Sequence, residues 1–145
     1  MRSSKRENSD ALKQISNAIS ESRTLIAVAG VLFGFLLSVS VNSPELDEIG
    51  RLLLSFSLML SLFTIILFSM PVIYHHLEFP YPNPQKFLKR YHWFMIMGFL
   101  PFMLTLYLAS SFALYQMIGL DALWFTGVVF LLAGLVYKMR RLSSK

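Results

Sequence analysis

The stretch TLIAVAGVLFGFLLSVSVN, residues 24–42, decides the fold of this chain. It runs for nineteen residues without a charge, which is about the length that an α-helix needs to cross a hydrocarbon core of ~30 Å. Three more apolar stretches follow, at about residues 52–74, 91–115 and 122–137. The sequence therefore predicts an all-α, polytopic membrane protein with four transmembrane helices.

The composition agrees with a protein that lies in lipid. Of 145 residues, 55% are hydrophobic and only 14% are charged, and the mean hydropathy is +0.58. A soluble domain has about 25% charged residues. The long polar segment 1–23 before the first span favours a retained anchor over a cleaved signal peptide. The chain has no cysteine, which excludes disulfides and thiolate chemistry.

The basic residues predict the orientation in the membrane. With both termini on one side, twelve of the thirteen Lys and Arg residues lie on that side, and Arg51 alone lies on the other. The positive-inside rule places the basic side in the cytoplasm. We therefore expect a multi-pass inner-membrane protein with N-in/C-in topology, made of a cytoplasmic segment 1–23, a transmembrane domain 24–138 and a cytoplasmic tail 139–145. Anionic lipid headgroups account for the net charge of +5, so no nucleic-acid partner is expected.

Local patterns predict how the spans begin and end. Leu12, Ile15 and Ile19 recur at helical spacing, which favours a short amphipathic cytoplasmic helix against the membrane surface or a partner, with a solvated leader as the alternative. Prolines in the segment HHLEFPYPN, residues 75–83, favour an extended linker. Asn83 and Pro84 then form a helix start. Gly119 and Asp121 predict a tight turn with a helix stop and a new N-cap.

Small residues line one face of the first span, because Ala27, Gly30, Gly34 and Ser38 follow at steps of three and four. Such a groove either packs against another helix or lines a narrow path, and packing is the commoner use. Arg23 precedes this face, and an acidic loop with Glu45, Asp47 and Glu48 follows the span. We take these eight residues as candidates for a pathway with an acidic outer rim.

The four apolar cores contain no Asp, Glu, Lys, Arg or His. Proton or sodium antiport usually needs an intramembrane carboxylate, and retinal needs a lysine, so both are improbable. Titratable groups gather instead at the cytoplasmic ends of the spans, where His75, His76 and His92 lie with Glu78. Their spacing matches no metal-ligand pattern, so we expect polar anchors and no metal or other cofactor. No enzyme motif is present, and we expect no catalytic activity.

The pieces ESR (21–23), GVLFGFLLSV (30–39) and MPVIYHHLEF (70–79) resemble a family of small four-span prokaryotic membrane proteins of unknown function, sometimes labelled sodium/proton antiporters. Pro71, Tyr74 and His75 form the sharpest motif of that resemblance. A fainter similarity links residues 22–24 and Gly30 to the Orai calcium channels. That similarity implies a ring of first helices around a pore, with Ser38 at the position of the Orai selectivity glutamate.

Two functions remain open from the sequence. The first is a homo-oligomeric ion channel or transport-type protein whose pathway is lined by the first span and whose acidic rim attracts cations. The second is a non-transporting scaffold or regulatory subunit that recruits a partner through its basic cytoplasmic face and proline-rich loop.

Overall fold

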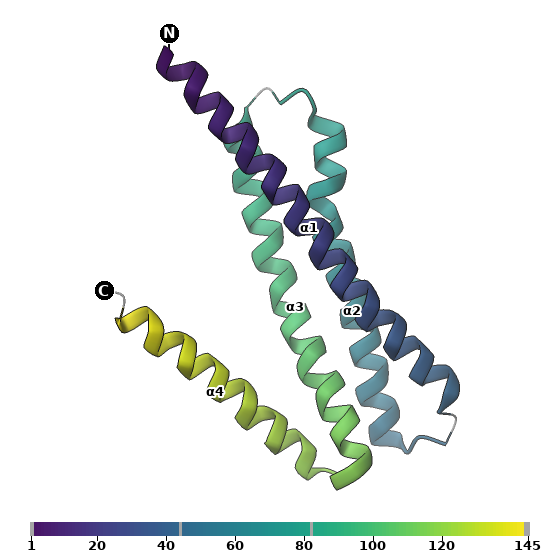
Figure 1. Ribbon diagram of the computed structural model, residues 1–145. Helices are drawn as coiled ribbons and strands as arrows, with labels where there is room; N and C mark the ends of the chain where they lie inside the picture. The colour runs from purple at the N-terminus through teal and green to yellow at the C-terminus, as the bar shows by residue number, and fades with distance from the viewer. Residues whose placement is uncertain (1, 44, 82, 144–145) are drawn as a thin grey trace.

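The computed structural model describes residues 2–43, 45–81 and 83–143, and this part of the chain forms four α-helices (Figure 1). Their bounds are α1 Arg2–Asn42, α2 Glu48–Glu78, α3 Pro84–Ile118 and α4 Asp121–Ser143. Each helix is long and apolar enough to cross a membrane. The chain is therefore an all-α protein whose four helices indicate a multi-pass membrane protein.

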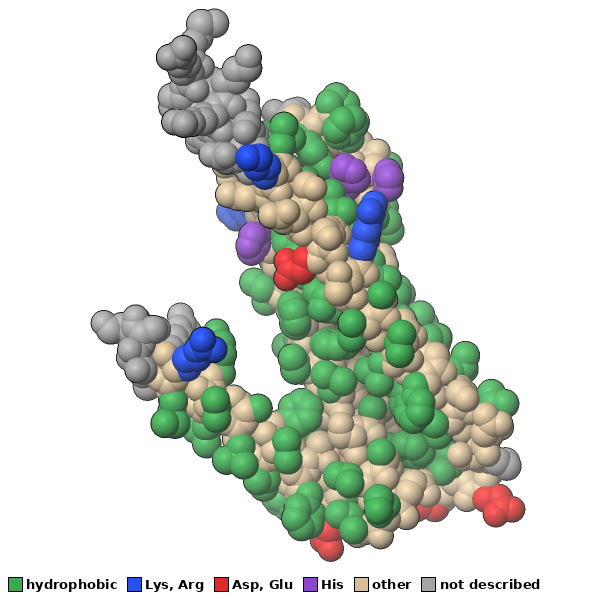
Figure 2. Space-filling view, viewed as in Figure 1, with side chains coloured by type: hydrophobic (Ala, Val, Ile, Leu, Met, Phe, Trp, Pro, Cys, Tyr) green, Lys and Arg blue, Asp and Glu red, His purple; other side chains and the backbone are tan. Residues whose placement is uncertain are grey.

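Most of the basic side chains gather at one end of the helices and most of the acidic ones at the other (Figure 2). We call the end where α2 joins α3 the basic end; it carries Arg23, His75, His76, Lys86, Lys89, Arg90 and His92. We call the opposite end the acidic end; it carries Glu45, Asp47, Glu48 and Asp121. Since α4 runs back from the acidic end, both α1 and α4 direct their chain termini away from it (Figure 1).

Helices α1, α2 and α3 form one bundle. Toward the basic end its core contains Phe68, Phe87 and Phe102 with residues of α1, and toward the acidic end it contains Leu36, Leu54 and Phe112. Gly98 allows the close approach of α2 and α3, because a Cβ there would lie 2.6 Å from the ring of Phe68. Burial of these apolar groups within the bundle holds the three helices in register.

Three buried hydroxyl groups of α2 have hydrogen-bond partners inside the bundle. Ser57 and Thr64 donate hydrogen bonds of 2.7 and 2.8 Å to the carbonyl oxygens four residues earlier in α2. Ser61 instead donates to the carbonyl oxygen of Ala29 on α1, at 3.4 Å. All three hydroxyl residues are buried. Their polar atoms are thus satisfied inside an apolar bundle, as helices in lipid require.

Helix α4 lies apart from this bundle. In the described part of the chain it contacts α3 but neither α1 nor α2, and Figure 1 shows it diverging from α3. Ala122 and Thr126 are buried against α3, and the ring of Phe130 meets that of Tyr107 edge-on at 5.7 Å. The rest of α4 is largely exposed, so the chain alone does not form a closed four-helix bundle.

The helix ends match the predicted caps at two places. The side chain of Asn83 accepts a hydrogen bond from the backbone N–H of Lys86 at 3.2 Å, and Pro84 is the first residue of α3. Gly119 ends α3 with a φ of +66°, a conformation that glycine adopts without strain. Asp121, predicted as a cap, is instead the first residue of α4.

The segment 75–83 differs from its predicted extended form. Residues 75–78 form the last turn of α2, which ends only at Glu78. The backbone leaves the helix at Phe79, the residue before Pro80, because a residue that precedes proline disfavours helical geometry. Pro82 lies outside the described residues.

The polar N-terminal segment continues directly into the first span, since α1 is one uninterrupted helix. Ile15 and Ile19 are buried in the same cluster as Phe87 and Leu88 of α3, whereas Leu12 is 49% exposed. The apolar stripe of this segment therefore packs mainly on the bundle's own α3.

Candidate functional site

The small-residue face of α1 points away from the bundle. Ala27, Gly34 and Ser38 are exposed, and Gly30 is half-buried. The residues that α1 buries against its neighbours are different ones, namely Ser22, Ala29 and Leu36. At 100° per residue these two sets lie on roughly opposite sides of the helix. Packing within the chain therefore does not use the groove.

Space around the two glycines of this face is open. A Cβ added at Gly30 or Gly34 would meet no other atom within 4 Å. Neither glycine is thus explained by contact with α2 or α3. Glycines four residues apart on an open helical face suit the close approach of a second helix in a membrane.

The acidic rim predicted from the sequence divides into two kinds of residue. Asp47 is the N-cap of α2, where its Oδ1 accepts from the backbone N–H of Gly50 at 3.0 Å. Its Oδ2 accepts a hydrogen bond from the hydroxyl of Tyr115 on α3. Within the predicted rim, Asp47 thus has a structural role besides its charge, whereas Glu45 and Glu48 are exposed carboxylates without a cap or tyrosine partner among the described residues.

The motif of Pro71, Tyr74 and His75 lies on the last two turns of α2. Pro71 is buried in the bundle. The ring of Tyr74 lies 5.6 Å from that of Phe94, and the guanidinium of Arg90 lies 5.8 Å from its centroid, a cation–π distance.

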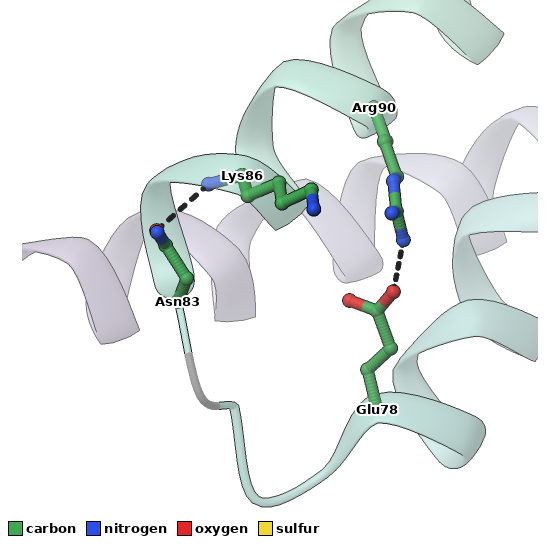
Figure 3. A network of polar contacts seen from close by, with 4 residues as sticks. All are labelled: Glu78, Asn83, Lys86 and Arg90. Atoms are coloured by element: carbon green, nitrogen blue, oxygen red, sulfur yellow. Dashed lines mark hydrogen bonds and ion pairs between the residues drawn. The ribbon is translucent and has the colours of Figure 1, made fainter.

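The same arginine joins α2 to α3 through an ion pair. Arg90 pairs with Glu78 across the connecting loop, and Asn83 caps the helix that carries the arginine (Figure 3). Both partners are partly exposed, so the pair adds little to the stability of the fold. We infer that it positions the loop between α2 and α3.

The three histidines do not form one cluster. The rings of His75 and His76 are 5.3 Å apart, and Nδ1 of His75 is hydrogen-bonded to the hydroxyl of Tyr81. His92 is on α3, with its Nδ1 2.9 Å from the carbonyl oxygen of Leu88. Among the described residues, no three His, Cys, Asp or Glu side chains come close enough together to hold a metal ion.

A pocket of about 490 Å³ lies at the basic end, between the first half of α1 and the loop that follows α2. Its polar lining comprises Ser16, Ser20, Arg23, His75 and Tyr81. Its apolar lining comprises Leu12, Ile15, Ile19 and Phe79. Arg23, predicted at the mouth of a pathway, is thus also part of a mixed polar and apolar cavity.

The hydroxyl of Tyr81 is hydrogen-bonded to His75 in this pocket. Burial, with a smaller contribution from the nearby Glu78 carboxylate, raises the pKa of Tyr81 above its ordinary value of 10.0. Its hydroxyl therefore stays protonated at neutral pH and can donate to Nδ1 of His75. A neutral imidazole that accepts at Nδ1 carries its proton on Nε2 and can itself donate there.

Sequence reasoning missed this pocket. Its α1 residues belong to the segment predicted as an amphipathic cytoplasmic helix, and Tyr81 belongs to the segment predicted as an extended linker. The contact joins residues about 60 positions apart, and spacing along the chain carries no signal for it. An available hint was the aromatic Tyr81 between two prolines, which packs its ring 5.0 Å from that of Phe87.

The comparison with protein families agrees with the resemblance seen in the sequence. The model of a family of unknown function, DUF6328, matches residues 4–140. No curated protein and no solved structure matches the chain. The similarity to Orai channels and the antiporter label accordingly gain no support from these comparisons.

Proposed function

This chain belongs to DUF6328, a family of unknown function, and we propose that it is a homo-oligomeric ion channel or transport-type protein with a pathway lined by α1. The observation that carries this proposal is the open face of α1. Ala27, Gly30, Gly34 and Ser38 lie roughly opposite the residues that α1 buries, and they form a strip along the first span.

An open face of this kind favours contact between copies of the chain. A helix face that contacts only lipid can carry large apolar side chains. Small side chains allow a second helix to approach closely. Copies of α1 around an axis would present Ala27, Gly30, Gly34 and Ser38 to one another or to a narrow lumen. The hydroxyl of Ser38 supplies a polar group in that lumen, as selective pores require.

The charges at the two ends of the strip suit a cation path. Glu45 and Glu48 at the acidic end would concentrate cations near its entrance. Arg23 at the basic end would form a positive ring in the oligomer, and its repulsion would limit passage there. We place the basic end in the cytoplasm, in accordance with the positive-inside rule.

Ion flux from liposomes that contain the pure protein tests the proposal. Flux is measured separately for K⁺, Na⁺, Ca²⁺, Cl⁻ and H⁺. We expect cation flux that falls at least tenfold in Gly34→Leu and in Ser38→Leu, because the added volume closes the path. Gly134→Leu on α4 is the matched control, since a Cβ at Gly134 likewise meets nothing within 4 Å, and its flux should equal that of the wild type.

Assembly is checked in the same samples by chemical cross-linking and by light scattering. Normal flux through a Gly34→Leu oligomer that still assembles would overturn the α1 pathway. An oligomer without flux for any ion would favour the alternative, a scaffold that recruits a partner through its basic face. Against that alternative, Tyr81 of the proline-rich loop packs onto the bundle, so the loop is a poor extended ligand.

A further inference from the structure

We propose that the pocket at the basic end binds a phosphate group with an apolar substituent, and that an anionic phospholipid supplies it. This inference does not require ion flux, although it shares Arg23 with the proposed pathway. It rests on the juxtaposition of Arg23 with His75 and of both with an apolar wall.

The polar lining has the chemistry of a phosphate site. Arg23 contributes a guanidinium, whose planar fork matches two phosphate oxygens. Ser16 and Ser20 contribute hydroxyls, and His75, hydrogen-bonded at Nδ1 to Tyr81, can donate at Nε2 when the tyrosine hydroxyl is the donor to Nδ1. The lining contains several donors and a fixed positive charge.

No carboxylate lining the pocket opposes an anion. The residues that surround it include neither Asp nor Glu. Of the two nearby acids, Glu21 accepts a hydrogen bond from Tyr91 and Glu78 pairs with Arg90. The one ion pair between described residues is that of Glu78 with Arg90, so the charge of Arg23 remains available to a ligand.

The apolar lining favours a ligand with a hydrocarbon part. Leu12 and Phe79 are 49% and 67% exposed beside the pocket. A free inorganic anion would leave this surface in contact with water. A ligand whose phosphate carries a carbon-containing substituent would cover it, with a gain that grows with the apolar area covered.

The depth of the pocket agrees with a lipid headgroup. Arg23 directly precedes the charge-free stretch that begins at Thr24, and His75 lies in the last turn of α2. Both therefore lie where hydrocarbon gives way to headgroups, and anionic phosphates concentrate at that level of a membrane. An arginine there can place its charge among phosphates while its stem stays in lipid.

Binding to the full chain in neutral maltoside micelles tests this inference. The probes are dihexanoyl phosphatidylglycerol, dihexanoyl phosphatidylcholine and inorganic phosphate. The readout is the rise in the melting temperature with probe concentration, because a ligand that binds the folded state stabilises it. We expect saturable stabilisation by phosphatidylglycerol, with a weaker effect of the zwitterionic lipid and of phosphate.

Variants locate the site. Arg23→Gln should raise the Kd for phosphatidylglycerol at least about tenfold, the scale of a hydrogen bond to a charged group. Lys89→Gln removes the same charge from an exposed position of the basic end that does not line the pocket, and its Kd should stay within about twofold of the wild type. Ser20→Ala, a mild change on the surface of α1, should raise the Kd about threefold.

Three outcomes would limit or overturn the proposed lipid site. Equal affinity for inorganic phosphate and phosphatidylglycerol would keep the phosphate site but assign it to a soluble anion. Equal losses in Arg23→Gln and Lys89→Gln would show diffuse attraction to the basic end and overturn the pocket. Unchanged binding in Ser20→Ala and Arg23→Gln together, with both proteins folded by circular dichroism, would overturn it as well.

Discussion

The hydroxyl of Tyr91 on α3 donates a hydrogen bond of 2.9 Å to Oε2 of Glu21 on α1, seventy residues earlier in the sequence. Tyr91 is only 5% exposed. Next to Glu21, the buried Ser22 donates to Sδ of Met95 at 3.6 Å. These two adjacent polar contacts fix the rotation and height of α1 against α3, and with them the direction in which the open face of α1 points.

Loss of the tyrosine hydroxyl should weaken the contact between α1 and α3. We expect Tyr91→Phe to lower the free energy of unfolding by about 1 kcal/mol, the usual contribution of one hydrogen bond. Thermal unfolding in detergent measures the change. Tyr137→Phe, at a position that is 71% exposed on α4, removes a hydroxyl that has no hydrogen bond to another described residue, and it should leave the melting temperature unchanged. Equal effects of the two variants would contradict the assigned role of Tyr91.

Gly98 should tolerate no side chain. A Cβ at this position would lie 2.6 and 2.7 Å from two ring atoms of Phe68, and that ring is fully buried against Phe99 and Phe102. We expect Gly98→Ala to cost roughly 1–3 kcal/mol, as overpacking does elsewhere. Gly134→Ala, where nothing lies within 4 Å, is the control. A melting temperature of Gly98→Ala equal to that of the control would show that α2 and α3 are less closely packed.

The fold was largely predictable because an apolar chain can cross a membrane in only a few kinds of secondary structure. Charge-free stretches of sufficient length must form helices, since backbone groups in lipid need internal partners. Caps such as Asn83 and Gly119 act locally and were readable for the same reason. The end of α2 was not, because the propensity of the prolines competed with the continuation of the helix through His75 and Glu78.

The candidate site was predictable only in part. The periodicity of Ala27, Gly34 and Ser38 placed them on one face, but no pattern says which face of a helix its neighbours cover. In the structure, Ser22 and Ala29 meet the bundle instead. The pocket with Arg23 and Tyr81 depends on contacts between distant segments, which a single sequence does not encode in its spacing.

Substitution of Asp47 should lower the free energy of unfolding, whereas substitution of its neighbour Glu48 should not. Asp47→Ala removes the N-cap of α2 and the partner of Tyr115, and we expect a loss of about 1 kcal/mol, within the range of roughly 0.5–2 kcal/mol for such caps. Asp47→Asn should retain most of the stability, because asparagine caps helices about as well as aspartate. Glu48→Gln should leave unfolding unchanged. A large loss in Asp47→Asn would mean that its charge, rather than its capping oxygen, stabilises this end.

The proposed orientation can be measured directly because the chain contains no cysteine. Single variants Glu45→Cys, Lys89→Cys and Met139→Cys introduce thiols at exposed positions of the acidic end, of the basic end and of the last turns of α4. In spheroplasts, a membrane-impermeant maleimide should label Glu45→Cys at once and the other two only after the membrane is permeabilised. The physical reason is that Lys and Arg near the span ends are retained on the cytoplasmic side during insertion. Labelling of Lys89→Cys but not Glu45→Cys in intact spheroplasts would reverse the orientation, and the acidic carboxylates of Glu45 and Glu48 would then face the cytoplasm.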